Sequence, residues 1–187
     1  GATWSDESIE GGSTFSSIWG GLKAEGDQYW ETITGVPGAG GNTVNGIVFD
    51  LIDFSGKKVV CGNFTTGGVN PAINIARLSG SVWAPLYNNT GPNAEIHDMV
   101  VFGSDLICAG EFTQIDGSSI NCVAAWNGTS WRQLGAGIAS PGGSGNLSQG
   151  VWELIVFDDN LYALGEPNCT AMWNGSSWTG LSLGEAP

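Results

Sequence analysis

Three acidic residues recur in one register of the chain, and each directly follows an aromatic or imidazole side chain. Carboxylates that face each other across a sugar could hydrolyse a glycosidic bond, and rings that face a common channel could stack on a sugar. In the structural alternative, the rings pack between repeats and the carboxylates accept hydrogen bonds from a neighbouring repeat's backbone. We expect this alternative to hold. The acidic residues are Asp50, Asp98 and Glu153, and the rings, which are the candidates for ligand binding, are Phe49, His97 and Trp152.

Other catalytic and metal-binding patterns are missing from the sequence. Any nucleophilic Ser or Cys would have to use His97, the single histidine, as its base, and no Gly-x-Ser-x-Gly elbow accompanies it. The cysteines contain no C-x-x-C pair, and the acidic residues do not follow the D-x-[DN]-x-[DN]-G spacing of a calcium loop. We therefore expect no catalytic residue, no metal and no cofactor.

Acidic residues dominate the charge of the 187-residue chain, which has 5 Lys and Arg against 18 Asp and Glu and a formal net charge of −13. Binding to a nucleic-acid backbone needs clustered basic residues, so nucleic acid is excluded as a partner. No apolar run approaches the ~20 residues that span a bilayer, so we expect no membrane insertion. Charged residues make up 12% of the chain, about half of the usual ~25%. Such a surface favours a protein that glycans or neighbouring subunits cover.

Six N-x-S/T sequons make the chain a candidate for N-glycosylation, since chance at this Ser and Thr content would give roughly two. Asn-Gly-Thr and Asn-Gly-Ser also serve as turns. The opening GATWSDES has no apolar leader, and we expect a mature product or a fragment. A secreted or cell-surface location explains these features together. The sequons are at Asn63, Asn88, Asn127, Asn146, Asn168 and Asn174.

Four cysteines form an even set, which is compatible with two disulfides in an oxidising compartment. Cys108 lies on a strand-like piece that should pair with the piece carrying Cys122, so this pair is the sterically attractive bridge. The alternative is four buried free thiols, because a register shift of one residue would point the two thiols to opposite faces. The disulfide candidates are Cys61, Cys108, Cys122 and Cys169.

Two fourteen-residue segments of the chain are similar in sequence. They are CVAAWNGTSWRQLG, from Cys122 to Gly135, and CTAMWNGSSWTGLS, from Cys169 to Ser182. The recurring landmarks are Trp30, Trp83, Trp131 and Trp178; Ala76, Ala124 and Ala171; and Phe54, Phe102 and Phe157. Their period of ~48 residues is typical of propeller blades. We predict one repeat domain, 1–187, with units at about 1–36, 45–86, 94–136 and 148–183, of which the first is degenerate.

Each later unit divides into four short pieces rich in β-branched and aromatic residues; in the third these are HDMVVF, DLICAGEFT, INCVAAW and TSWRQLG. The joint between the last two is Asn127-Gly128, which favours a type I′ hairpin turn. The sequence predicts an all-β, propeller-like chain of about four blades, with the recurring tryptophan filling a core slot between blades. The pattern is compatible with a closed ring in which one blade is degenerate. It is equally compatible with an open stack of blades that another chain completes.

Two units, GNFTTGGVNPAINIARLSGSVWAPL and GEFTQIDGSSINCVAAWNGTSWRQLG, resemble blades of the kelch and galactose-oxidase-like propeller superfamily. They are most similar to G-x-F-T … N-x-A-x-W/L-x-G-x-x-W-x-x-L repeats of secreted and cell-surface proteins. The resemblance covers about residues 46 to 182 and implies a propeller fold more than any activity. Copper radical oxidases of that superfamily use two His and two Tyr ligands, so a chain with His97 alone does not inherit their site.

Three hypotheses for the function follow. The leading one is a non-enzymatic, extracellular structural or adhesive module that assembles with copies of itself or with other surface proteins. The second is a glycan-binding propeller. The third is a secreted propeller enzyme, such as a hydrolase that uses Asp98 or Glu153.

Overall fold

The computed structural model describes residues 44–68, 70–80, 82–88, 90–138, 150–165 and 170–181. Every regular element in these ranges is a β-strand, and the strands form antiparallel sheets. The prediction of an all-β chain is therefore confirmed. The degenerate first unit, 1–36, lies outside the described residues.

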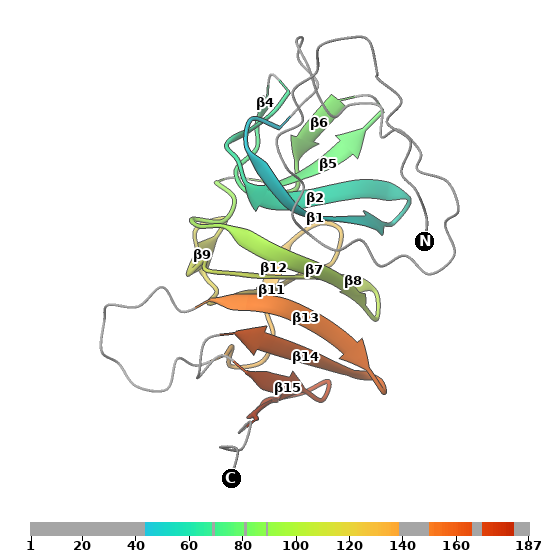
Figure 1. Cartoon of the computed structure of the whole chain (residues 1–187), viewed down its shortest axis with the longest axis vertical. Coiled ribbons are helices and arrows are strands. Elements are labelled where there is room, and N and C mark those ends of the chain that lie inside the picture. The colour runs from blue at the N-terminus through green and yellow to red at the C-terminus, as the bar shows by residue number, and fades with distance from the viewer. Residues whose placement is uncertain are drawn as a thin grey trace, which may run out of the picture.

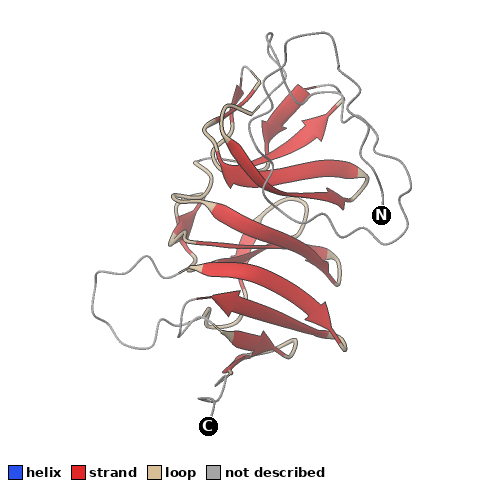
Figure 2. Cartoon of the chain, in the orientation of Figure 1, coloured by secondary structure: helices blue, strands red, loops and turns tan. Residues whose placement is uncertain are grey.

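Three four-stranded sheets follow one another along the chain and lie one above the other (Figures 1 and 2). Each sheet falls within one of the three later predicted units. The first sheet contains β1 (Ile47–Phe54), β2 (Lys57–Asn63), β5 (Ile75–Ser79) and β6 (Val82–Pro85). The second contains β7 (Ile96–Phe102), β8 (Asp105–Gly110), β11 (Val123–Trp126) and β12 (Trp131–Gln133). The third contains β13 (Val151–Phe157), β14 (Asn160–Gly165), β15 (Ala171–Trp173) and β16 (Trp178–Gly180).

Two small ribbons accompany the first and second sheets. They are β3 (Thr66–Gly67) with β4 (Asn70–Pro71), and β9 (Gln114–Ile115) with β10 (Ser118–Ser119). An asparagine side chain holds the start of each ribbon. The Asn45 Oδ1 accepts bonds of 2.8 and 2.9 Å from the backbone N–H groups of Thr65 and Thr66. Asn93 makes the equivalent pair of bonds, at 2.9 and 3.0 Å, and these contacts explain the polar end of the G-x-F-T motif.

The hairpins are closed by two different kinds of turn. Strands β13 and β14 are joined by Asp158 and Asp159, which both have positive φ, the signature of a tight hairpin whose twist matches its strands. The prediction of a type I′ turn at Asn127-Gly128 is wrong. Four residues separate the paired Trp126 and Trp131, and Asn127 has no positive φ because its side-chain oxygen accepts the backbone N–H groups of the turn instead.

Two of the three hydrophobic clusters lie between the stacked sheets, and the third consists of residues of the unit at 45–86. One hydrophobic cluster joins the first and second sheets through side chains such as Val59, Ile75, Leu106 and Ile96. A second cluster joins the second and third sheets in the same way. Trp131 packs against the first of these clusters and Trp178 against the second, and both are partly buried. Trp83, the equivalent residue of the first sheet, is fully buried, but its cluster is made of residues from its own unit.

The predicted bridge between Cys108 and Cys122 is wrong. Cys108 is a free thiol, and it lies opposite Ala124 in the β8–β11 pairing. Cys61 is likewise a free thiol, and both lie fully buried in the cluster between the first two sheets. Burial is the largest cause that raises the pKa of each thiol well above its usual value. Cys169 lies outside the described residues.

Candidate functional site

The three predicted ring residues are brought together by a repeated irregularity of the first strands. The pairing of β1 with β2 shifts by one residue between Val48 and Asp50, and equivalent shifts occur in β7 and β13. The extra residue at each β-bulge is one of the three rings, so each bulge turns a ring toward the neighbouring sheet. The ring centroids of Phe49 and His97 are 5.3 Å apart, and those of His97 and Trp152 are 4.3 Å apart.

This row of rings has a closed middle and an open end. The His97 side chain is almost completely buried, and its Nε2 lies 3.6 Å from the Oε1 of Glu111. Trp152 is 46% exposed at the other end. His97 therefore packs between the other two rings, in agreement with the packing interpretation. Of the three rings, only that of Trp152 is exposed to solvent.

The carboxylates beside the rings bind the next sheet. The Asp50 Oδ2 accepts a hydrogen bond of 3.2 Å from the backbone N–H of Met99 on β7. The Asp98 Oδ2 accepts one of 2.6 Å from the backbone N–H of Leu154 on β13. The interpretation of these two residues as acceptors for a neighbouring repeat's backbone is confirmed. A glycosidase needs both carboxylates at the sugar, whereas each of these has one oxygen engaged with another sheet.

Burial changes the titration of both carboxylates. Desolvation is the largest cause at Asp98 and raises its pKa from 3.8 to about 6, although the hydrogen bond from Leu154 acts in the opposite direction. Desolvation also raises the pKa of Asp50, against the bonds from Leu51 and Met99. Each junction between sheets therefore contains a carboxylate that holds its proton more tightly than an exposed one.

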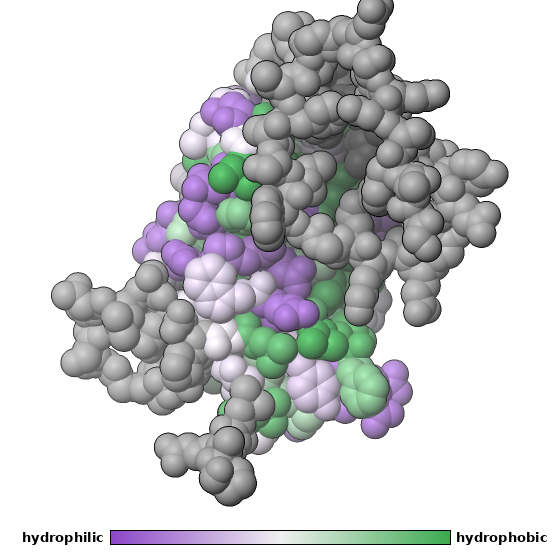
Figure 3. All heavy atoms as spheres, in the orientation of Figure 1, coloured by the Kyte–Doolittle hydropathy of each residue, from purple (hydrophilic) through white to green (hydrophobic). Residues whose placement is uncertain are grey.

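Among the described residues, no further sheet lies on the same surface of the third sheet. Glu153 occupies the position of Asp50 and Asp98 and is exposed, and its carboxylate makes no hydrogen bond or ion pair with another described residue. Phe157 occupies the position of Phe54; Phe54 is 7% exposed and Phe157 is 68% exposed. Of the six large hydrophobic side chains exposed in the described ranges, four belong to β13, namely Trp152, Ile155, Val156 and Phe157. Hydrophobic atoms gather over β13 in Figure 3.

The sequons in the described residues are exposed but differ in their contacts. The Asn127 Oδ1 accepts bonds from Thr129 and Ser130, and Asn174 makes the equivalent bonds in the third sheet. At Asn63 and Asn88 the amide nitrogen, the atom that a glycan would use, donates to Glu95 and to the backbone oxygen of Thr129 respectively. Asn146 and Asn168 lie outside the described residues.

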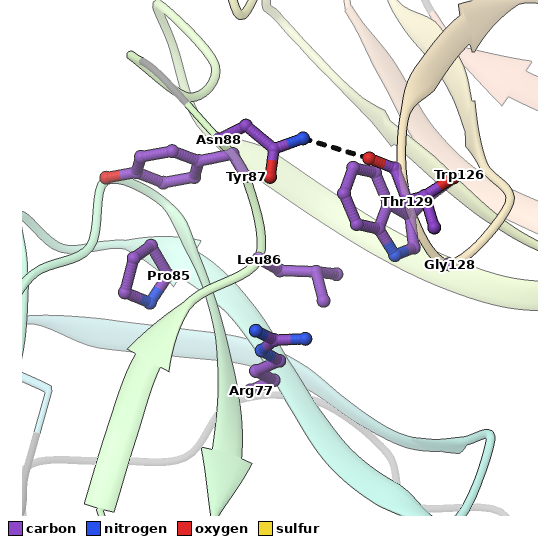
Figure 4. A pocket seen from close by; sticks show the side chains of 8 residues that line it. All are labelled: Arg77, Pro85, Leu86, Tyr87, Asn88, Trp126, Gly128 and Thr129. Atoms are coloured by element: carbon purple, nitrogen blue, oxygen red, sulfur yellow. Dashed lines mark hydrogen bonds between the residues drawn. The ribbon is translucent and has the colours of Figure 1, made fainter.

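A pocket between the first and second sheets was not predicted. It has a volume of about 210 Å³ and is lined by Arg77, the segment from Pro85 to Asn88, and residues of the β11–β12 turn (Figure 4). The signal for Arg77 was present in the sequence. Arg77 follows the recurring Ala76, and the same place in the next two units holds Ala125 and Met172. A charged residue at one apolar position of a repeat indicates a local role.

No family model, curated protein or solved structure matches the chain. The resemblance to kelch and galactose-oxidase-like blades thus stays a prediction. None of the described residues belongs to a helix long and apolar enough to cross a membrane.

Proposed function

We propose that this chain is a non-enzymatic, extracellular structural or adhesive module of propeller-like blades, which assembles with copies of itself through the exposed face of its third sheet. The observation that carries the proposal is the open surface of β13. The same surface is covered on the first sheet by the second, and on the second sheet by the third.

Three features end together at this surface. The aromatic row ends at the half-exposed indole of Trp152. Glu153 is the last of the three equivalent carboxylates. The apolar side chains of Ile155 and Phe157 are exposed, whereas the equivalent Ile52 and Phe54 pack in the cluster between the first two sheets. Exposed apolar side chains that gather on one strand mark an interaction surface more often than scattered ones do. A second copy supplies the required occupant, because two identical faces related by a two-fold axis can cover each other.

Composition supports an extracellular setting for this assembly. Few charged side chains cover the surface, and the exposed sequons at Asn127 and Asn174 keep their amide nitrogens outside the turn bonds. Glycans at these turns would lie on the β11–β12 and β15–β16 turns, whereas the open surface is formed by β13. Glycosylation and assembly are therefore compatible in one molecule.

Disulfide trapping tests the proposed contact. The variant Phe157→Cys places a thiol on the exposed face, and mild oxidation should yield a covalent dimer. The matched variant Val101→Cys places a thiol at an exposed apolar position of the second sheet, 41% accessible, and should yield much less dimer. Equal trapping of the two variants, or no dimer from Phe157→Cys, would refute the proposed interface.

A further inference from the structure

The pocket between the first and second sheets combines a cation with an aromatic wall. Arg77 enters it from β5, and Trp126 and Thr129 face it from the β11–β12 hairpin of the second sheet (Figure 4). Leu86 and Tyr87 form the wall that follows β6. Residues far apart in the sequence thus meet at the junction of two sheets, a common place for ligand sites.

Among the described cations, Lys58 pairs with Asp53 and Arg132 pairs with Asp105, while Lys57 is exposed to solvent. Arg77 differs from all three because part of its guanidinium is buried. Arg77 has no acidic partner among the described residues, and its Nε is buried without a hydrogen-bond partner there. A guanidinium with unused donors is expensive to bury unless an anion or another acceptor meets it. The unused donor favours a ligand that carries an acceptor, above all an anion, and this local attraction has to exceed the repulsion from a net charge of −13.

The rim and size of the pocket narrow the class of ligand. The Asn88 amide donates a bond of 2.9 Å to the backbone oxygen of Thr129, which leaves the amide oxygen of Asn88 at the rim as an acceptor. The indole of Trp126 and the side chain of Leu86 also line the pocket, where they expose only a small part of their apolar surface, 4% and 3%. A volume of about 210 Å³ is below the roughly 300–1,000 Å³ of pockets for drug-sized ligands. It suits one small ring.

We propose that this pocket binds an acidic monosaccharide, with its carboxylate on the guanidinium of Arg77, its ring against Trp126 and its hydroxyl groups at the rim around Asn88. Planar guanidinium groups recognise carboxylates through paired, charge-assisted hydrogen bonds. Amphipathic sugar faces fit a pocket that has an aromatic wall and a polar rim. The site does not use β13, so it is independent of the proposed assembly.

The test is a titration with sodium D-glucuronate, followed through the NMR signals of the Arg77 Nε–H and the Trp126 indole N–H. D-glucose and sodium acetate, titrated in parallel, carry the neutral ring and the carboxylate separately. We expect glucuronate to shift both signals and to bind about tenfold or more tightly than either probe, because a charge-assisted contact adds to the ring contact. Glucuronate binding no tighter than glucose or acetate, or shifts confined to other signals, would overturn the proposal.

Matched variants distinguish the effect of Arg77 in the pocket from the effect of a changed net charge. Arg77→Gln should weaken glucuronate binding by about tenfold or more, whereas Arg132→Gln removes the same charge from an exposed side chain and should leave binding unchanged. Asn88→Asp keeps Arg77, adds a negative charge at the exposed rim in exchange for the bond donated to Thr129, and should also weaken binding. If Arg77→Gln fails to fold, Asn88→Asp decides. Unaltered binding in Asn88→Asp, or equal losses in Arg77→Gln and Arg132→Gln, would contradict the assignment. Phe157→Lys, which should stop assembly, should leave glucuronate binding intact.

Discussion

The carboxylate of Asp98 on the second sheet accepts a hydrogen bond of 2.6 Å from the backbone N–H of Leu154 on the third. Asp50 makes the same contact with Met99 at the previous junction. Each contact satisfies a backbone donor of a bulged edge strand, where the regular ladder is interrupted. The pair of contacts defines a clamp that joins successive sheets, and Glu153 is the place where the next clamp would form.

The clamp at Asp98 should make stability depend on pH. Because burial raises the pKa of Asp98 to about 6, the folded chain binds this proton more tightly than the unfolded chain between about pH 4 and pH 6. The contribution to stability is fully present below this window and is lost as the pH rises through it. Asp50 adds a slope of the same sign.

Asp98→Asn tests this dependence, because an amide oxygen can still accept the Leu154 N–H while the side chain stays neutral. The free energy of unfolding, measured with urea from pH 4 to pH 7, should fall less steeply in the variant. The difference is at most about 1.4 kcal/mol per pH unit for one proton. At pH 7 the variant should be at least as stable as the wild type. Glu153→Gln controls for the lost charge, and an unchanged slope in Asp98→Asn would reject this account of the clamp.

The tryptophans should separate into core and surface positions. Trp83 is fully buried, so Trp83→Ala should lower the free energy of unfolding by about 3–5 kcal/mol through lost contacts and a cavity. Trp152→Ala removes a half-exposed ring and should cost less than about 1 kcal/mol in dilute solution. Chemical denaturation of the two variants gives the comparison. Similar losses for both would mean that the exposed end of the aromatic row supports the fold as strongly as its buried parts do.

The buried thiols should be inert until the chain unfolds. Cys61 and Cys108 are free, fully buried and held in the neutral form by burial. Peptide mapping after brief treatment with a thiol reagent should find both unlabelled in native protein and both labelled in denaturant. A bridge that includes Cys108, or a large fall in melting temperature on reduction that maps to either residue, would contradict this result.

Much of the architecture could be predicted because each unit repeats its landmarks. The spacing of Phe54, Phe102 and Phe157 placed one equivalent residue on the first strand of each sheet, and the register of Phe49, His97 and Trp152 correctly grouped three rings that lie side by side. The register between neighbouring strands was harder to predict. Sequence spacing suggested that Cys108 faces Cys122, whereas pairing places it opposite Ala124, two residues further on.

The site features that escaped prediction depend on contacts between units. Nothing in the local pattern showed that Asn45 and Asn93 hold the ribbons, because their partners lie about twenty residues away. The pocket at Arg77 is formed by segments from two sheets, so its shape is a property of their packing. The open surface of β13 could not be read from sequence either, since Phe157 and the buried Phe54 have the same residue type.

Two substitutions that remove the sequon at Asn127 should differ in their effect on the stability of the fold. Asn127→Asp keeps the side-chain oxygen that caps the turn, so its stability should stay within about 0.5 kcal/mol of the wild type. Asn127→Ala loses that acceptor and should cost about 1 kcal/mol. Both variants abolish the sequon. Thermal unfolding of material without glycans measures the difference, and equal stability of the two would show that the Asx contacts contribute nothing.

The measurement that tests the assembly most directly is the mass of the glycan-free particle by light scattering over a range of protein concentrations. We predict a mass that rises above the 19.3 kDa of one chain as concentration increases. Phe157→Lys should stay at the mass of one chain, because a charge in the apolar contact disfavours its burial, while Val101→Lys should behave like the wild type. A wild type that stays near 19.3 kDa throughout, or a Phe157→Lys variant that assembles normally, would contradict the account.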